Sequence, residues 1–182
     1  GLLGERLKAA DCLYAGIVTH YVPSEQIEAL TRALVEEDAA VEDVLARFHT
    51  DPGAAPLASV RAQIDRHFAG DTVEEIVESL GSGDDWAVGV KDRLLALSPT
   101  SLKLTLRAVR AGASLDLAGC LRQEYRIVCQ IKQGHDFYEG VRAQLIDKDR
   151  NPKWNPATLA EVTPAMLDPH FEEPKGGDVR LD

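Results

Sequence analysis

Apolar residues recur at three- or four-residue intervals along most of the chain, a spacing that places them on one face of an α-helix. Val60, Ile64 and Phe68 illustrate the four-residue interval. Glycine, proline and polar capping residues separate one such stretch from the next, so the pattern predicts a series of amphipathic helices. The predicted helices cover residues 1–14 with a break near Lys8, 24–35, 38–48, 57–69, 71–80, 86–97, 98–112, 114–132 and 136–146.

Capping signals and an apolar stripe support these assignments. The capping signals are Ser24, the pair Asp71 and Glu74, Ser98 followed by Pro99, and the pair Asp136 and Glu139. The apolar stripe of the longest predicted helix consists of Leu117, Cys120, Leu121, Val128 and Ile131. Gly134 then provides a stop signal for that helix. Helices of this kind pack their apolar faces against a common core.

Only residues 15–23, with the sequence AGIVTHYVP, have the pattern of a β-strand. β-Branched residues cluster there, and Pro23 ends the run. A single strand leaves its backbone N–H and C=O groups without partners, so we expect a second strand from elsewhere to pair with it. The fold class predicted for the residues present is therefore mainly α.

The charge balance is acidic, with 20 Lys and Arg against 30 Asp and Glu and a formal net charge of −10. Such a surface repels phosphate backbones and anionic lipid, which disfavours nucleic acid and membranes as partners. No apolar run approaches the roughly 20 residues that span a bilayer. The length predicts one domain, residues 1–163, and the polar residues 164–182 are expected to form a partly disordered tail.

The cysteines and histidines show no metal or disulfide pattern. Cys12, Cys120 and Cys129 lack CxxC spacing and stand among aliphatic residues, which favours reduced, structural thiols in a cytosol-like compartment. The histidines are scattered at irregular intervals, and no Walker loop, dinucleotide fingerprint or zinc-protease motif is present. We therefore expect no metal site.

The stretch from His135 to Trp154 holds the densest mixture of acidic, basic and aromatic residues. Its DKDRNP segment begins like a calcium-binding loop, but Pro152 stands where the loop needs Gly, and Thr158 stands where it needs a bidentate Glu. A cluster of cations in this stretch suits either a phosphate-bearing ligand or a solvated face. These cations are Arg142, Lys148, Arg150 and Lys153.

Two other polar groups have both a catalytic and a structural interpretation. Ser98 and Lys103 have the residue types of a Ser/Lys nucleophile pair, but the start of a helix accounts for the hydroxyl. Glu124 stands close to the apolar stripe, where a structural ion pair with Arg126 is a more common role than that of a general base.

Three segments together resemble one enzyme family. They are ERLKAADCLYAGIVTHYVPSEQIEAL, SPTSLKLTLRAVRAG and LRQEYRIVCQIKQGHDFYEGVRAQLIDKDRNPKWNPATLAEV. They look like the C-terminal part of the 3-hydroxyisobutyryl-CoA hydrolase family, within the crotonase (enoyl-CoA hydratase/isomerase) superfamily. The resemblance spans about residues 2–163. Residues 4–22 are similar to crotonases in general, with Leu3 where Thr is more usual, whereas DFYEGVRAQLIDKDRNPKW is typical of the hydrolase branch.

The resemblance implies a crotonase-like α/β fold, in which a ββα superhelix is followed by a helical C-terminal region supplied by this chain. It implies an acyl-CoA substrate of valine breakdown, whose thioester carbonyl lies in an oxyanion hole of two backbone amides. It implies no cofactor other than the coenzyme A of the substrate. The catalytic Glu and Asp of the family precede Gly1 in the family's order, so we expect this chain alone to be inactive. The expected partner is then the N-terminal half of the same enzyme, and homo-oligomer formation is left open.

Lys148 is the ligand-contact candidate that the resemblance implies. Crotonases commonly carry a pattern in which Glu-Gly precedes an Ala-Phe pair and a Lys-Arg pair, and the Lys meets the phosphates of CoA. Glu139, Gly140, Ala143, Lys148, Pro152 and Trp154 fall on that pattern, with Leu145 in place of Phe and Asp149 in place of Arg. The acidic neighbours Asp147 and Asp149 offer Lys148 a structural partner instead.

Two other functions stay open on the sequence. One is an enoyl-CoA hydratase or isomerase, which differs from the hydrolase in carboxylates that this chain lacks. The other is a non-catalytic helical interaction module. The family fits a cytoplasmic location, or the mitochondrial matrix in a eukaryote.

Overall fold

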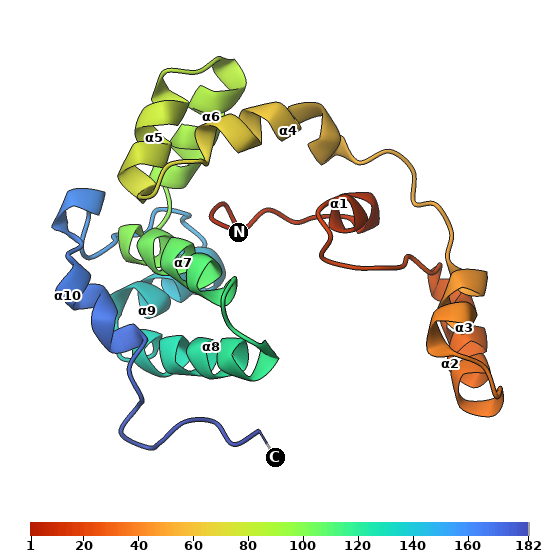
Figure 1. The fold of residues 1–182 in the computed structure, drawn as a ribbon. Helices are drawn as coiled ribbons and strands as arrows, with labels where there is room; N and C mark the ends of the chain where they lie inside the picture. The colour runs from red at the N-terminus through yellow and green to blue at the C-terminus, as the bar shows by residue number, and fades with distance from the viewer. Residues whose placement is uncertain (182) are drawn as a thin grey trace. The chain divides into compact units, whose positions relative to one another are not determined.

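The computed structural model describes residues 1–181, which form helices joined by turns and by longer non-helical segments (Figure 1). The mainly helical fold expected from the sequence is confirmed, and no β-strand occurs in this described range. None of its helices combines the length and apolarity needed to cross a bilayer. The chain divides into two compact units, one of residues 5–66 and one of residues 1–4 together with the chain from His67 onward.

The β-strand predicted for residues 15–23 is wrong. Ile17 N donates a hydrogen bond to Cys12 O at 2.9 Å, which extends the end of a helix. Tyr21 N donates to His49 Nδ1 at 3.1 Å. A strand needs a neighbouring strand for its backbone hydrogen bonds, and residues 1–181 contain none, so β-branched composition does not suffice here.

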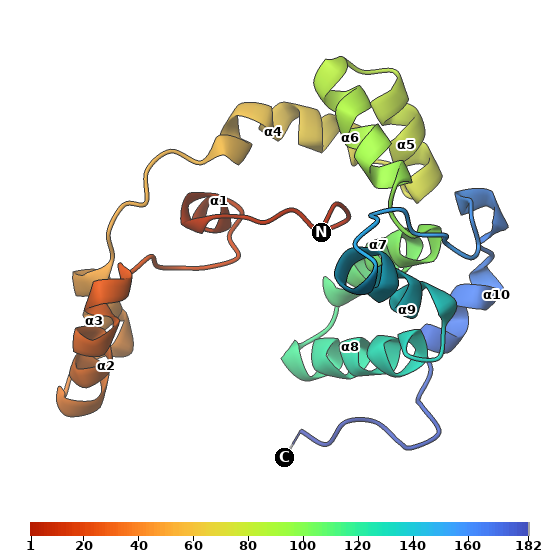
Figure 2. The same ribbon diagram turned by 180° about the vertical axis from the view of Figure 1, so that it is seen from behind.

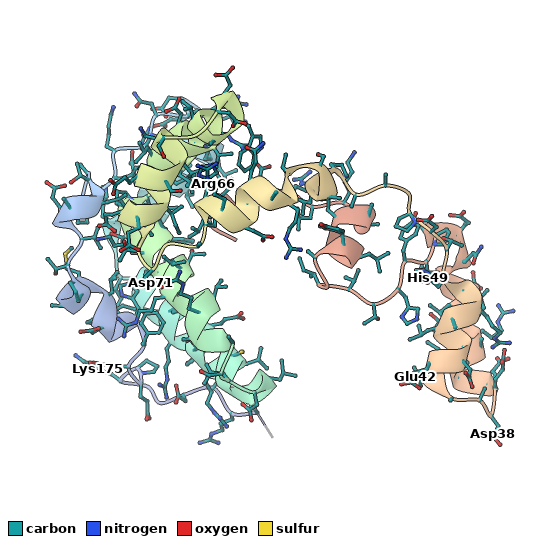
Figure 3. All side chains as sticks on the ribbon, turned by 45° about the horizontal axis from the view of Figure 1, so that its top comes forward. Asp38, Glu42, His49, Arg66, Asp71 and Lys175 are labelled. Carbon is teal, nitrogen blue, oxygen red and sulfur yellow. The ribbon has the colours of Figure 1, made fainter. Side chains whose placement is uncertain are left out.

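The unit of residues 5–66 has a small core between two antiparallel helices. Its helices are α1 (Ala9–Tyr14), α2 (Ile27–Glu36), α3 (Val41–Phe48) and most of α4 (Pro56–His67). Leu30 and Ala33 of α2 pack against Val44 of α3, which is 1% exposed. Asp38, labelled in Figure 3, lies in the connection between these two helices.

Two helix starts in this unit differ from the prediction. Residues 1–8 are not helical, and α1 begins only at Ala9. Ser24 does not cap α2, because it belongs to a separate 3₁₀ turn, Ser24–Gln26, and α2 begins after that turn at Ile27.

The larger unit is built on α5 (Val73–Gly81), α6 (Asp85–Leu95) and α7 (Pro99–Gly112), followed by α8 (Leu117–Ile131), α9 (His135–Val141) and α10 (Pro164–Leu167). Helices α5 and α6 lie side by side in both views (Figures 1 and 2). Their buried side chains and one from α7 form the main core: Val73, Ile76, Leu80, Ala87, Val90, Leu94 and Leu102. Burial of apolar side chains of this size supplies roughly 1.5–3 kcal/mol each, which makes this core the main source of stability in the unit.

The capping pair predicted at the start of α5 is wrong by one residue. Thr72 and Glu75 form the capping box, in which Thr72 Oγ1 accepts from Glu75 N at 3.2 Å and Glu75 Oε2 accepts from Thr72 N at 3.1 Å. The predicted pair, Asp71 and Glu74, instead forms ion pairs with cations of α7. The two carboxylates that the spacing predicted at the helix start therefore bind Lys103 and Arg110 of α7 instead.

One serine cap and one aspartate cap fix the starts of α7 and α8. Ser98 caps α7 as predicted, since its Oγ accepts a hydrogen bond from Ser101 N at 3.1 Å. Helix α8 begins at Leu117, later than predicted, because Asp116 Oδ1 accepts from Gly119 N at 2.7 Å and so fixes the cap there.

No residue of α8 is buried. Of its predicted apolar stripe, Leu117, Leu121 and Val128 are exposed, and Cys120 and Ile131 are half-buried. The helix packs on α7 and on the turn after α10, and it leaves much of its apolar surface uncovered by residues 1–181.

Residues 164–181 pack against α7 and α8. Leu167 of α10 joins Leu104 and Val162 in a second apolar cluster. Arg126 of α8 donates to Asp178 Oδ1 at 2.7 Å and to Phe171 O at 3.0 Å. Two kinds of contact, apolar and ionic, therefore hold this segment against the helices.

Candidate functional site

The stretch that carries the densest chemistry in the sequence forms a closed helix–loop unit. Helix α9 continues into a π-helical turn, Arg142–Ile146, and the chain then returns along α9. His135 Nε2 donates to Lys153 O at 2.9 Å, and Lys153 N donates to Glu139 Oε1 at 2.6 Å. Two side chains of α9 thus bind the backbone of Lys153 in the returning segment. These contacts fix the loop between α9 and Lys153.

The interpretation of Asp136 and Glu139 as a helix cap is wrong. The N-cap residue of α9 is Gly134, and no side chain caps the helix. Asp136 accepts hydrogen bonds from Ser98 Oγ at 2.5 Å and from Asn155 N at 2.8 Å, while Glu139 binds cationic and backbone donors. Ser98 and Asn155, both distant in sequence, therefore bind Asp136, whereas Arg142, only three positions away, binds Glu139.

Arg142 is the centre of the loop. Its Nε and Nη2 donate to the two carboxylate oxygens of Glu139, both at 2.8 Å. Its Nη1 donates to Asp147 Oδ2 at 2.7 Å and to Asp149 Oδ2 at 2.8 Å. Its Nη2 also reaches Asn151 O at 3.3 Å. The planar, five-donor guanidinium is suited to gathering several acceptors in this way.

The ion pairs shift the protonation of this cluster. Arg142, together with the Lys153 N–H, lowers the pKa of Glu139 to about 2. Arg142 likewise lowers the pKa of Asp149, and the three carboxylates raise the pKa of Arg142. The Glu139 side chain is only 9% exposed, so its charge depends on this pairing.

Lys148, the candidate predicted from the sequence, projects from this loop into solvent. Its flanking carboxylates, Asp147 and Asp149, are both held by Arg142, and Lys148 has no ion pair or hydrogen-bond partner within residues 1–181. Its φ of 56° lies in the left-handed region, as does that of Arg150 at 54°. Such a backbone is uncommon for residues other than glycine, and the contacts of Arg142 stabilise it here.

The predicted positive cluster is only partly available for a ligand. Arg142 forms ion pairs with three carboxylates, and Lys153 Nζ donates to Asn151 Oδ1 at 3.0 Å. Lys148 and Arg150 are exposed and form no ion pair within the described chain. Sequence reasoning missed the role of Arg142 as a hub, although the three-residue spacing from Glu139 is a helical ion-pair signal.

A groove of about 550 Å³ adjoins the helix–loop segment of residues 135–154. It lies between the starts of α7 and α9, residues 1–4 and α10. Asp136 and Trp154 line it, and Trp154 Nε1 donates to Ala96 O at 3.0 Å. Thr100 Oγ1 and His170 Nδ1 also belong to its lining residues, and both atoms are buried without a hydrogen-bond partner. Burial lowers the pKa of His170, so the ring is neutral near neutral pH.

The other polar candidates have structural partners. Lys103 Nζ pairs with Glu74 Oε1 at 2.6 Å and donates to Val162 O at 3.0 Å. Arg126 pairs with Asp178 rather than with Glu124, which is exposed. Among residues 1–181, no three His, Cys, Asp or Glu side chains gather as metal ligands, and the cysteines are free thiols.

Comparison with known proteins defines the class first. The model of the enoyl-CoA hydratase/isomerase family matches residues 1–171, and the chain belongs to this family. Two solved structures share the fold. A carnitinyl-CoA dehydratase from Mycobacterium thermoresistibile is 40% identical, with a TM-score of 0.81 over 97% of this chain and 51% of that one. An enoyl-CoA hydratase from Rhodobacter sphaeroides is 30% identical, with a TM-score of 0.82 over 100% of this chain and 52% of that one.

Within the family, the chain is similar to curated 3-hydroxyisobutyryl-CoA hydrolases. It is 42% identical to the mitochondrial enzyme of Xenopus laevis over 190 residues, and 40% identical to the human mitochondrial enzyme over 195 residues. A probable 3-hydroxyisobutyryl-CoA hydrolase of Arabidopsis thaliana is 39% identical over 186 residues. The matches cover 94–99% of this chain and 49% of each relative, so the chain spans about half the length of these relatives. The resemblance inferred from the sequence motifs is confirmed.

Proposed function

We propose that the chain is the helical C-terminal part of an acyl-CoA thioester hydrolase that acts on 3-hydroxyisobutyryl-CoA. The observation that carries the proposal is the identity of about 40% to such hydrolases over nearly the whole chain. In the reaction, water adds its hydroxyl to the acyl carbon, the C–S bond breaks, and coenzyme A leaves as a thiol. An oxyanion hole stabilises the charge that develops on the carbonyl oxygen.

The 182-residue chain is expected to be inactive by itself. Asp136, which lines the groove, is bound to Ser98 and Asn155, and Glu139, on the same helix, is bound to Arg142. A general base needs a carboxylate free to accept a proton from water, and a pKa near 2 makes Glu139 a weak base. The catalytic carboxylates are therefore assigned to the part of the enzyme outside these residues.

Lys148 is the proposed contact for the phosphates of coenzyme A. It is exposed and unpaired within residues 1–181, while the neighbouring Arg142 is neutralised. An ammonium group on a flexible stem suits a phosphate whose position is fixed by other parts of the ligand.

A hydratase is the second candidate, supported by the solved structures titled carnitinyl-CoA dehydratase and enoyl-CoA hydratase. A single preparation of the complete protein that contains this chain separates the two functions. We expect release of free coenzyme A from 3-hydroxyisobutyryl-CoA, detected with a thiol reagent, and no hydration of crotonyl-CoA. Hydration without thiol release would replace the hydrolase by a hydratase. Absence of both reactions, with tight binding of another protein, would favour a helical interaction module.

The same assay on the 182-residue chain tests where catalysis lies. We expect no thiol release above the rate without protein, and turnover by this chain would contradict the assignment of the catalytic carboxylates elsewhere. Location follows the relatives: the Xenopus and human enzymes are named mitochondrial, so we propose the mitochondrial matrix if the source is a eukaryote, and the cytoplasm otherwise. A fluorescent fusion of the complete protein would report it.

A further inference from the structure

We propose that Arg142 is a positioning residue that keeps Lys148 available to phosphate by holding both carboxylates beside it. The inference rests on the proposed function, in which Lys148 meets the phosphates of coenzyme A. Arg142 itself does not touch the ligand in this scheme. Its part is to remove two competitors for the Lys148 ammonium.

The sequence places the competitors directly beside Lys148, in the order Asp147, Lys148, Asp149. In the structure both carboxylates turn to the same nitrogen, Arg142 Nη1, at 2.7 and 2.8 Å. Lys148 is left exposed and without an ion-pair partner in the described chain. The neighbours that sequence alone presents as partners of Lys148 are thus partners of Arg142.

Arg142 is held in place by a buried contact on its other edge. Glu139 binds its Nε and Nη2 and is itself fixed by Lys153 N at 2.6 Å. The Glu139 side chain is 9% exposed, whereas those of Asp147 and Asp149 are 51% and 44% exposed. The anchoring edge is therefore buried, and the edge that binds the two aspartates faces solvent.

The backbone of the loop agrees with this division. Lys148 and Arg150 both adopt left-handed conformations, with φ of 56° and 54°. Asp149 Oδ1 accepts a hydrogen bond from Asn151 N at 2.9 Å, and Arg142 Nη2 reaches Asn151 O. An unfavourable backbone at two positions persists only where the surroundings determine it, and here these surroundings converge on Arg142.

The local charge depends on Arg142 as well. Between Glu139 and Lys153 the chain has four Lys and Arg and three Asp and Glu, a net charge of +1. Loss of Arg142 makes this charge zero and releases two carboxylates next to Lys148. Phosphate would then compete with an intramolecular carboxylate for the ammonium, and its affinity would fall.

The test measures, by calorimetry, how tightly the complete protein binds coenzyme A and pantetheine. Pantetheine lacks the nucleotide of coenzyme A and all of its phosphates. We expect Arg142→Gln to weaken coenzyme A binding about tenfold, which corresponds to the loss of one charge-assisted hydrogen bond. Pantetheine binding should stay unchanged. Lys148→Gln should have the same effect. Adding Asp147→Asn and Asp149→Asn to Arg142→Gln should restore most of the affinity, because amides do not compete for the ammonium but keep the acceptors of the loop.

A second variant covers the case in which Arg142→Gln leaves Glu139 buried and unpaired and so unfolds the loop. Glu139→Gln combined with Arg142→Gln removes both charges and should show the same selective loss for coenzyme A. Arg61→Gln, which breaks an exposed pair with Asp65 in the unit of residues 5–66, is the control and should change neither ligand.

The outcomes separate the inference from the function on which it rests. If Lys148→Gln does not alter coenzyme A binding, or the complete protein does not bind it, the proposed phosphate contact is wrong. If Lys148→Gln weakens binding and Arg142→Gln does not, the positioning role is wrong. Equal loss for coenzyme A and pantetheine, or failure of the two Asp→Asn changes to restore affinity, would give Arg142 a structural role only.

Discussion

Ser98 Oγ donates a hydrogen bond to Asp136 Oδ2 at 2.5 Å, across 38 positions of sequence. The same hydroxyl oxygen accepts from Ser101 N at the start of α7, and the same carboxylate accepts from Asn155 N. One pair of side chains therefore ties the starts of α7 and α9 to the returning loop. Ser98 is 5% exposed, so water does not replace a lost partner easily.

Ser98→Ala should lower the free energy of unfolding by about 1–3 kcal/mol, because it removes the cap of α7 and leaves Asp136 with one donor fewer. Urea unfolding followed by circular dichroism measures the change. Ser59→Ala is the matched control, since its exposed hydroxyl donates only to Pro56 O within the same helix. A loss for Ser98→Ala no larger than that for Ser59→Ala would contradict the role given to the buried hydrogen bond.

The lowered pKa of Glu139 makes the stability of the fold depend on pH. Its folded-state pKa of about 2 lies below the ordinary 4.5, so its charge stabilises the fold above the ordinary value, and this contribution is lost as the pH falls from 4.5 towards 2. Glu139→Gln has no such charge. We expect the wild-type protein to melt at a higher temperature than Glu139→Gln near neutral pH, and the gap to narrow when both are melted at about pH 3. Equal gaps at the two pH values would show that the ionised carboxylate contributes nothing.

Gly83, in the turn before α6, and Gly89, on the exposed side of α6, should respond oppositely to alanine. Gly89 lies inside α6 with nothing within 4 Å of an added Cβ, so Gly89→Ala should raise the free energy of unfolding by about 0.5–1 kcal/mol. An added Cβ at Gly83 would meet Ala87 Cβ at 2.5 Å and the His67 ring at 3.0 Å, so Gly83→Ala should lower it by roughly 1–3 kcal/mol. Denaturant titration of the two variants checks the contrast, and a stabilised Gly83→Ala would contradict the close packing at that turn.

Asp178 holds the last residues of the chain through Arg126. Asp178→Asn removes the charge that Arg126 pairs with and replaces one of the two acceptor oxygens by an amide NH2 group, which cannot accept from the guanidinium, so residues 172–181 should detach more often. Lys175 lies in this segment and is labelled in Figure 3. Trypsin should therefore cut after Lys175 faster in Asp178→Asn than in the wild-type protein, as followed by mass spectrometry. An unchanged rate would mean that the apolar contacts of α10 alone hold the segment, and rapid cleavage of both proteins would support the disordered tail expected from the sequence.

The helices could be predicted from the sequence where the signal is local. Ser98 followed by Pro99 gave the start of α7 correctly, because the cap hydroxyl and the amide it binds are three residues apart. Val90 and Leu94, four residues apart within the predicted helix of residues 86–97, are buried in the main core, as the apolar face of such a helix should be.

The predictions failed where a partner other than the expected helix end or strand decides the outcome. Asp136 and Glu139 have the spacing of a cap, yet Ser98 and Arg142 take their carboxylates. The strand of residues 15–23 needs a second strand that residues 1–181 lack. Lys148 was found through resemblance, but only the structure shows that its acidic neighbours face a different cation.

The sharing of Arg142 among its acceptors has a consequence for how this region evolves. A change at Arg142 alone exposes Lys148 to Asp147 and Asp149, whereas joint loss of the arginine and both aspartates keeps the lysine unpaired. Drift at these positions should therefore be correlated. Across the family, lineages that lack the arginine but retain the lysine should have replaced the flanking aspartates by neutral residues.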